Sequence, residues 1–425
     1  MTVAQKSLLA LHGGAKAVQS DPGDMFTWPI VTAEDEEAVL EVLRRGAMSG
    51  TDVTHKFEED LGAWFGVDYT LCHNTGTAAI QAAMYACGVR TGDEVICQSM
   101  TYWGSALQVF TLGGTVVFGE IDPETLTLDP GDIEHRITER TKAIIVVHYC
   151  GHPTDMDPIM EIAARRNVKV IEDVSHAQGA IYKGKLGGTI GHVGAMSIMS
   201  GKSLACGEGG FLVTDDEEIY ERAAAFGHYE RTGSLQHADL APFAGMPLGG
   251  YKYRMHQLSS AVGRVQLKYY KERVREIQQA MNYFWDLLKG VPGVKAHRPP
   301  ADSGSTMGGW YAAKGLYAPE ELNGLPVAKF CQAVTAEGAS ISPGANILMH
   351  LHPMLNKADV YGHGKPTRIA HSDRDLRQPA GSLPVTESMV ERCYSIPWFK
   401  HHRPEIIEEY ALAFRKAAEN ADALQ

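Results

Sequence analysis

Short runs of apolar residues, each the length of one strand, recur along the first half of the chain. They cover residues 94–97, 115–118, 143–147, 168–171 and 210–214. The first three are separated by segments long enough for helices. Continuous apolar runs are typical of strands buried on both faces of a parallel sheet. The alternation therefore predicts an α/β fold, with helices covering both faces of a mainly parallel sheet.

Other segments follow the helical repeat. A short strand-like run at 69–72 turns through residues 73–77 into an alanine-rich stretch that strongly favours helix. Thr32, followed by acidic and then apolar residues, predicts a capped helix that ends at Gly46. From 255 to 289, apolar residues recur at near-helical spacing without a proline, which predicts one long helix.

The long predicted helix also suggests where one domain ends. Gly290-Val-Pro-Gly293 breaks it, and the sequence that follows mixes short strands and helices and is rich in Pro, Gly and His. We therefore expect residues 1–290 to form a large domain with an N-terminal arm. Residues 291–425 are expected to form a smaller C-terminal α+β domain.

Composition narrows the class of protein. The net charge of −12 argues against a nucleic-acid-binding protein, which would usually carry a basic patch. The apolar stretch at residues 8–11 is too short for a signal peptide or a membrane span. Seven cysteines are scattered without a Cys-x-x-Cys pair, which favours free thiols in a reducing compartment. We expect a cytoplasmic protein that binds neither nucleic acid nor membranes.

Two segments carry candidate chemistry. Lys202 lies in a stretch of small residues, with Ser197 five residues before it. Asp173 follows the apolar run at 168–171, and His176 stands three residues further on. A pyridoxal phosphate (PLP) enzyme needs a lysine for the cofactor aldehyde and a carboxylate for the pyridinium nitrogen. The order and surroundings of Lys202 and Asp173 match this requirement.

Each of these residues has an ordinary alternative. A single lysine is usually a solvated surface group, and an aspartate after a strand is usually a turn or a helix cap. Lys202 stands out because its neighbours are small and apolar and because glycines crowd it. Glycines are expected where backbone must approach a ligand closely. A functional role for His176 is expected only if Asp173 has one.

The strand-to-helix turn at Thr75-Gly76-Thr77 is a candidate anion site. Free backbone N–H groups and the helix dipole favour a phosphate there, although an ordinary helix cap explains the turn equally well. Ser197 is compatible with phosphate binding or with a place in the core. Tyr102 follows another strand end and could stack on the pyridine ring, whereas Trp103 is expected to pack in the core.

A metal site is not predicted. His350 and His352 lie two residues apart in a tract rich in hydrogen-bonding groups, but the sequence offers them no convincing third ligand. We expect some residues of the tract 349–368 near the second substrate. The stretch 228–231 is a second candidate for the wall of the same pocket.

Several motifs occur together and in one order. They are Gly13-Gly14-Ala, Asn74-Thr-Gly-Thr-Ala-Ala, Gly92-Asp-Glu-Val-Ile, Ile121-Asp-Pro-Glu-Thr-Leu-Thr-Leu-Asp-Pro, Val147-His148-Tyr-Cys-Gly151, Glu172-Asp173 with His176, Gly201-Lys202 with Gly207-Glu-Gly-Gly, and Gly250-Tyr-Lys-Tyr-Arg254-Met. With them the chain resembles the DegT/DnrJ/StrS family of sugar and cyclitol aminotransferases. The resemblance covers essentially the whole large domain and continues more weakly into residues 395–400.

The resemblance implies a fold-type I PLP enzyme, with a large α/β/α domain and a smaller α+β domain. It implies that Lys202 forms the Schiff base with PLP and that Asp173 bonds the pyridinium nitrogen. His176 would bond the phenolic oxygen, and Tyr102 would stack on the ring. The implied activity is a ping-pong transfer of an amino group from glutamate or glutamine to a keto sugar or ketocyclitol.

The resemblance also implies how the cofactor phosphate is held. Gly76, Thr77 and Ser197 fall where the family binds it. Lys252 stands where the family has an asparagine that reaches into the neighbouring subunit, and a lysine suits phosphate as a point charge. A homodimer with shared active sites follows from this interpretation. Gly201 and Gln98 depart from the residues expected at their positions and affect the shape of the pocket.

Three other functions are alternatives to this interpretation. A sugar dehydratase on the same scaffold would be expected to have histidine in place of Lys202. A non-catalytic PLP-binding regulator is disfavoured by the presence of Lys202 and Asp173, and no DNA-binding segment is evident. A Rossmann enzyme would need a Gly-x-Gly-x-x-Gly fingerprint after the first strand, which residues 74–79 do not provide.

Overall fold

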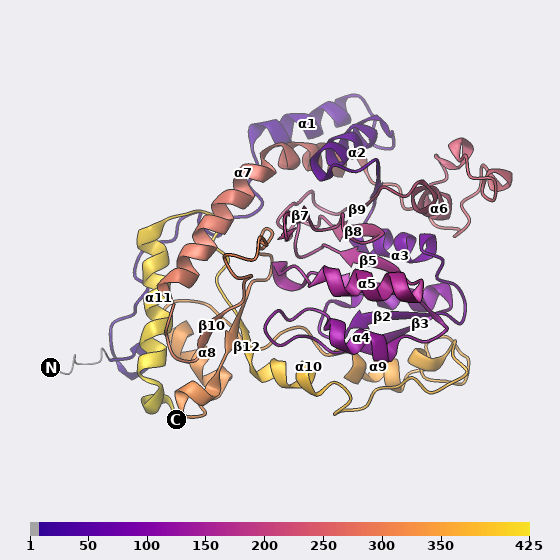
Figure 1. Cartoon of the computed structure of the whole chain (residues 1–425). Helices are drawn as coiled ribbons and strands as arrows, with labels where there is room; N and C mark the ends of the chain where they lie inside the picture. Colours follow the sequence, from indigo (N-terminus) through magenta and orange to yellow (C-terminus); the bar gives the residue numbers. More distant parts are fainter. Residues whose placement is uncertain (1–7) are drawn as a thin grey trace.

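The computed structural model describes residues 8–425 and is organised around a seven-stranded sheet (Figure 1). Its strand order is β1-β9-β8-β5-β4-β2-β3. The strands are β1 (Tyr69–His73), β2 (Glu94–Gln98), β3 (Thr115–Gly119), β4 (Thr141–Val147), β5 (Lys169–Asp173), β8 (Val193–Ser197) and β9 (Gly210–Thr214). β9 is antiparallel to both of its neighbours, and the pairs from β8 to β3 are parallel. The predicted mainly parallel sheet is confirmed.

Side chains along each central strand alternate between the two faces. Val95 and Cys97 pack in one core cluster, while Ile96 between them packs in another. Helices α3 (Gly76–Ala86) and α6 (Glu217–Gly227) cover the first face, and α4 (Pro130–Arg136) and α5 (Met156–Arg166) cover the second. Burial on both faces explains why these strands are apolar throughout.

Three helices pack together beyond the β1 end of the sheet (Figure 1). They are α1 (Ala33–Arg44), α2 (Asp52–Phe65) and the long α7 (Gln257–Leu287). The predicted cap of α1 is present, since the backbone N–H of Thr32 donates to the Asp35 carboxylate at 2.8 Å. Within residues 8–425, no helix combines the length and the apolar character needed to cross a membrane.

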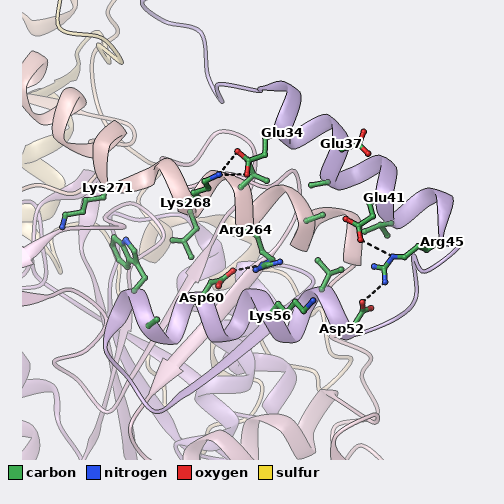
Figure 2. A pocket seen from close by; sticks show the side chains of 18 residues that line it. Glu34, Glu37, Glu41, Arg45, Asp52, Lys56, Asp60, Arg264, Lys268 and Lys271 are labelled. Carbon is green, nitrogen blue, oxygen red and sulfur yellow. Dashed lines mark hydrogen bonds and ion pairs between the residues drawn. The ribbon is translucent and has the colours of Figure 1, made fainter.

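A groove of about 880 Å³ runs between α1, α2 and α7 (Figure 2). Ion pairs cross it, including Lys268 with Glu34 and Arg264 with Asp60. None of the residues singled out for chemistry lines this groove. We therefore regard it as a helix-packing seam with paired charges, and the candidate site lies elsewhere.

The C-terminal part contains a second, antiparallel sheet of β10 (Val294–Ala296), β11 (Lys314–Tyr317) and β12 (Cys393–Ser395). Helices α8 (Val327–Ala336) and α11 (Pro404–Glu419) pack with it and with the second half of α7. A two-stranded sheet, β6 (Ile181–Tyr182) with β7 (Lys185–Leu186), lies within the large domain.

Packing crosses the domain boundary that we predict near residue 290. The N-terminal arm contributes Leu9, Ala17 and Met25 to the core of the C-terminal part. The buried carboxylate of Glu337 accepts the backbone N–H of Ala10 at 2.7 Å and pairs with Lys416 at 2.8 Å. The arm, which we predict to belong to the large domain, is thus fixed to the small sheet and its helices.

Residues 345–391, which we call the edge segment, lie along the opposite border of the large sheet. They include the short helices α9 (Pro353–Asn356) and α10 (Pro384–Ser388), seen beside β2 and β3 in Figure 1. The Gln378 amide bonds both the N–H and the C=O of Phe118, at 3.0 and 2.8 Å, much as another strand would. The edge segment therefore covers the free edge of β3, and this prevents the strand from pairing with another chain.

Candidate active site

Lys202 lies in the loop between β8 and β9, where its backbone N–H donates to the Met199 carbonyl at 2.8 Å. Its side chain is only 6% exposed. Among the described residues the ammonium has no hydrogen-bond acceptor, and it lies 3.9 Å from the centre of the Tyr311 ring. Burial lowers the pKa of Lys202 to about 8, although the nearby Asp173 carboxylate acts in the opposite direction. A substantial share of this amine is therefore neutral near pH 8.

Asp173 ends β5, and its carboxylate is fixed from two sides. Oδ2 accepts the Ser105 hydroxyl at 2.6 Å, and Oδ1 accepts the backbone N–H of Ser175 at 3.0 Å. Two hydrogen bonds leave further acceptor capacity on a carboxylate. The side chain is almost completely buried, so its charge is directed at the interior of the site.

The preceding residue, Glu172, points to the other face of the sheet, as alternation along a strand requires. It accepts the Nε2–H of His148 at 2.9 Å and the backbone N–H groups of Gly188, Ile190 and Gly191. Burial alone would raise the pKa of Glu172, but these donors hold it below its ordinary value. The hydrogen bonds of the Glu172 carboxylate thus fix the backbone of residues 188–191.

His176 has a defined tautomer. Its Nδ1 accepts the backbone N–H of Cys150 at 3.3 Å, so the proton of the neutral ring is on Nε2. Burial lowers the pKa of His176 far below its usual value, with Lys202 adding to the effect. The ring therefore stays neutral and presents an Nε2–H donor. Cys150 has a φ of 53°, an unusual conformation for a non-glycine residue.

The start of α3 has the features expected of an anion site. The Thr75 side chain accepts the N–H of Ala78 and caps the helix. The N–H groups of Gly76 and Thr77 and the Thr77 hydroxyl have no partner among the described residues. A Cβ on Gly76 would stand 2.5 Å from that of Ser197, so only glycine lets α3 begin this close to β8. Gly76, Thr77 and Ser197 are thus brought together.

Tyr102 and Trp103 lie on the loop after β2, and both are 49% exposed. Their ring centres are 4.9 Å apart. The expectation that Trp103 packs in the core is wrong, because the loop turns its ring outward. Gly104 lies beneath Tyr102, where an added Cβ would come within 3.0 Å of the Tyr102 ring.

Lys252 is exposed on the loop between α6 and α7. Its backbone carbonyl accepts the Asn74 side chain at 3.4 Å, so this loop lies beside the end of β1. The expected second wall is only partly exposed: His228 is buried against the His73 ring and Arg231 pairs with the buried Glu58 at 2.6 Å, whereas Tyr229 is 41% exposed.

The tract 349–368 contains both buried and exposed residues. His350 and Arg368 are completely buried in the edge segment, which excludes them as direct contacts to a substrate. Within residues 8–425, no three His, Cys, Asp or Glu side chains are grouped so that they could hold a metal ion.

The model of the DegT/DnrJ/EryC1/StrS aminotransferase family matches residues 29–414. The chain belongs to this family. Membership accounts for the order of the motifs and for the meeting of Lys202, Asp173 and His176 at one end of the sheet.

Individual members show how far the similarity extends. The spore coat polysaccharide biosynthesis protein SpsC of Bacillus subtilis is 30% identical over 380 residues, covering 86% of this chain and 93% of SpsC. A putative L-glutamine:3-amino-2,3-dideoxy-scyllo-inosose aminotransferase of Micromonospora echinospora is 29% identical, covering 94% of each chain. The solved aminotransferase of Psychrobacter cryohalolentis superposes with a TM-score of 0.79 at 26% identity, covering 92% and 97%.

The residues of this family member fit PLP. Lys202 offers a buried amine without an acceptor, and Asp173 keeps lone pairs free beside it. His176 presents a single N–H donor, which suits a phenolate oxygen. The unpaired N–H groups at the start of α3 suit a phosphate. Each recognised part of the cofactor thus has a matching group.

Several residues that shape the site are not predicted from the sequence. Ser105 and Ser175 fix Asp173, and the backbone of Cys150 sets the tautomer of His176. Tyr311 covers the Lys202 amine, and the residues on either side of it, Trp310 and Ala312, both have positive φ. A serine is too common to be singled out, and Tyr311 comes from beyond the predicted boundary.

Proposed function

We propose that this protein is a PLP-dependent aminotransferase that moves an amino group from L-glutamate or L-glutamine to a keto sugar or ketocyclitol. The observation that carries the proposal is the buried Lys202 amine, which has a pKa of about 8 and no hydrogen-bond acceptor within residues 8–425. A lysine kept in this state is suited to act as a nucleophile and then as a base.

The roles of the residues follow from their hydrogen bonds. Bound PLP supplies an aldehyde that links to amines and a pyridinium ring that accepts electrons. The Asp173 carboxylate, held by Ser105 and Ser175, is the acceptor that keeps the pyridine nitrogen protonated. His176 donates its Nε2–H to the phenolic oxygen. Once displaced, Lys202 Nζ takes the proton that leaves the α-carbon of the amino donor.

The phosphate and the ring need further contacts. Gly76 and Thr77 offer N–H groups, and Thr77 and Ser197 offer hydroxyls, for the phosphate. Tyr102, whose ring is half exposed, is assigned to stack on the pyridine. Holding the phosphate at one end and the nitrogen at the other fixes the ring relative to Lys202.

The acceptor is proposed from the relatives. One is named for polysaccharide biosynthesis and another for an inosose and for glutamine as the donor. Both a keto sugar and a ketocyclitol present a ketone flanked by hydroxyls. Two substrates that each exchange an amino group at one site imply a ping-pong reaction, in which the donor's keto acid leaves before the acceptor binds.

We further propose a homodimer with shared active sites. Lys252 is exposed, and Phe243 and Met246 on the same loop expose more than half of their side chains. Apolar side chains on an extended loop favour burial against another protein surface. In a dimer Lys252 would supply a cation to the cofactor phosphate of the partner subunit.

The cysteines bear on the location of the protein. Seven free cysteines, all buried, support a cytoplasmic location.

The alternative is a sugar dehydratase on the same scaffold. It is disfavoured because Lys202 stands where a dehydratase would be expected to have histidine. The two activities differ in what the acceptor becomes, since an aminotransferase places an amine on it, whereas a dehydratase removes a hydroxyl group as water.

The test begins with the purified protein and PLP. L-Glutamate and L-glutamine are added separately while the visible absorbance of the lysine-linked cofactor and the release of keto acid are followed. Loss of the visible band with stoichiometric keto acid identifies the donor, and the resulting protein is then offered keto sugars and inososes. A visible band that neither donor changes would exclude the proposed half-reaction.

A further inference from the structure

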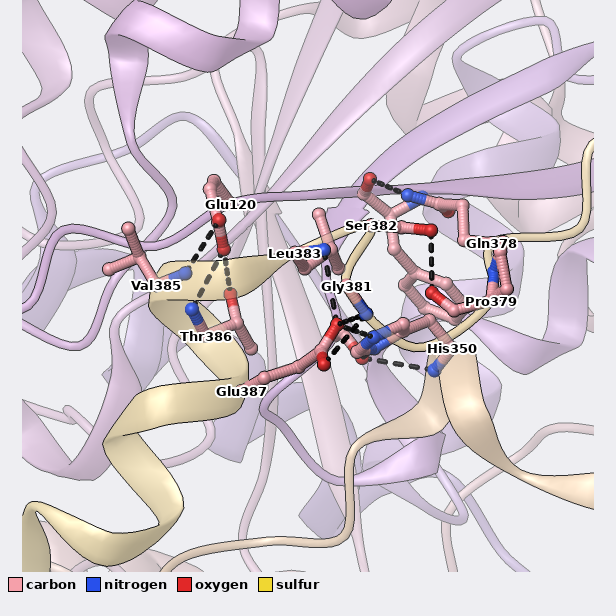
Figure 3. Close-up of polar contacts among 12 residues, drawn as sticks. Glu120, His350, Gln378, Pro379, Gly381, Ser382, Leu383, Val385, Thr386 and Glu387 are labelled. Carbon is pink, nitrogen blue, oxygen red and sulfur yellow. Dashed lines mark hydrogen bonds and ion pairs between the residues drawn. The ribbon is translucent and has the colours of Figure 1, made fainter.

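The edge segment joins the sheet next to the active-site loop, and a polar cluster marks the junction (Figure 3). On one side, the Glu120 carboxylate, which follows β3, accepts the N–H groups of Val385 and Thr386 at 2.9 and 2.8 Å. This fixes the start of α10. α10 then brings the Glu387 carboxylate to the buried His350 ring.

His350 is at the centre of this cluster and is completely buried. Its Nδ1 lies 2.7 Å from the Ser99 hydroxyl, and its Nε2 lies 3.1 Å from the Glu387 carboxylate. The Ser99 oxygen also accepts the backbone N–H of His350 at 3.0 Å. Because the Glu387 carboxylate can only accept a hydrogen bond, the ring proton is on Nε2, directed at Glu387, and Nδ1 accepts the proton of the Ser99 hydroxyl.

Glu387 is itself held in place. Its two carboxylate oxygens accept the backbone N–H of Gly381, each at 2.9 Å, and one also accepts that of Leu383 at 3.2 Å (Figure 3). These bonds lower the pKa of Glu387 against the opposing effect of burial. A fixed acceptor on Nε2 fixes the rotation of the His350 ring, and hence the direction of Nδ1.

Ser99 opens the loop that carries two residues of the candidate active site. Its carbonyl accepts the N–H of Met349 at 3.2 Å, so Ser99 is bound to the edge segment through both its backbone and its side chain. Three residues further on is Tyr102. Then comes Ser105, whose hydroxyl bonds Asp173 at 2.6 Å.

We propose that His350 is a positioning residue for cofactor binding: through Ser99 it sets the loop that places Tyr102 and Ser105, while Glu387 fixes its ring. The inference rests on the proposed function. Serine, histidine and glutamate are also the residue types of a hydrolase triad. Ser99, however, is completely buried, and its hydroxyl donates its hydrogen bond to His350, so it is not a nucleophile.

Two substitutions separate the two hydrogen bonds of the ring. The short amide of His350→Asn can reach the position of Nδ1 and keeps the bond to Ser99. The longer amide of His350→Gln can reach the position of Nε2 and keeps the bond to Glu387. Ser99→Ala removes the same link as His350→Gln from the other end. His352→Asn is the matched control, since His352 is exposed and its ring accepts only the N–H of Met354.

The full-length proteins are titrated with PLP, and the dissociation constant and the visible circular dichroism of the bound cofactor are measured beside the melting temperature. We expect His350→Gln and Ser99→Ala to weaken PLP binding about tenfold, the effect of one lost buried hydrogen bond, and to change the dichroism. His350→Asn and the control are expected to bind as the unmodified protein does.

A merely structural role predicts a different pattern, in which His350→Asn and His350→Gln lower the melting temperature alike and leave PLP binding unchanged. That pattern, or weaker binding in His350→Asn than in His350→Gln, would overturn the proposal. If His350→Gln does not fold, Ser99→Ala decides by the same criterion. Failure of the unmodified protein to bind PLP would instead refute the proposed function, so the two failures are distinguishable.

Discussion

The indole N–H of Trp28 donates a hydrogen bond of 2.8 Å to the backbone carbonyl of Lys202, from 174 residues away in sequence. Trp28 follows the N-terminal arm that is fixed to the C-terminal part of the chain. Its ring packs near Trp398, and Trp398 in turn meets the edge of Tyr311, which covers the Lys202 amine. The loop of the proposed catalytic lysine is thus held by the N-terminal arm and by the C-terminal part of the chain as well as by the sheet.

Trp28→Phe should therefore slow the reaction while leaving the fold intact. The phenyl ring keeps most of the packing but removes the only hydrogen-bond donor, and one hydrogen bond corresponds to about tenfold in rate. The half-reaction with the amino donor measures the effect. Trp64→Phe, in a tryptophan that packs on Phe65 and Tyr270, is the control and should react normally. Equal rates in both variants would contradict a role for the Trp28 bond.

Lys202→Ala should bind PLP without the visible absorbance of a lysine-linked cofactor and lose turnover by several orders of magnitude. Lys400→Met provides an informative control. Lys400 is also buried, and burial lowers its pKa to about 8 as well, but its amine bonds the Trp398 carbonyl at 3.0 Å. It should keep the visible band. A band that survives in Lys202→Ala and vanishes in Lys400→Met would transfer the assignment to Lys400.

Asp173→Asn should keep the fold, since the amide oxygen still accepts the N–H of Ser175. The loss of the negative charge beside the pyridinium nitrogen should slow the first half-reaction on the order of a hundredfold. Ser105→Ala, which removes only one hydrogen bond to Asp173, should cost about tenfold. Stopped-flow absorbance with the amino donor measures both. An unchanged rate in Asp173→Asn would remove this carboxylate from the mechanism.

The sequence predicted the parts of the site that follow directly from strand ends. Asp173 could be predicted because it follows a buried apolar run, and Lys202 because small residues and glycines surround it. Gly76 is a position of close approach, as the sequence predicts, and what comes close is the backbone of Ser197. Local pattern thus indicates the residues that we propose to react with the cofactor.

The residues that orient these groups could not be predicted in the same way. Trp28, Ser105 and His350 act through single hydrogen bonds formed between distant segments. Nothing in the residues around them sets them apart from ordinary core or turn positions. The path of the edge segment, which buries His350 and Arg368 of the tract expected near a substrate, depends on tertiary contacts such as that of Gln378 with Phe118.

The neighbouring carboxylates Glu172 and Asp173 should respond differently to loss of charge. Glu172→Gln places an amide NH₂ among backbone donors and should lower the free energy of unfolding by about 3 kcal/mol or more. The pKa of Glu172 is lowered in the folded protein, so its stabilisation is complete above the ordinary glutamate pKa and is lost as the pH falls through the folded value. Denaturant unfolding should show a weaker acid dependence in Glu172→Gln than in the unmodified protein.

The lowered pKa of Lys202 gives the last prediction. Only the neutral amine attacks an aldehyde, and burial lowers the pKa of Lys202 to about 8. The rate at which the PLP-free protein forms its visible band should therefore rise with pH and level off above about pH 8. For an ordinary lysine the rise would continue to well above pH 9, because its pKa is about 10.4. A rate that keeps rising through that range would show that the Lys202 amine is not held neutral by its buried site.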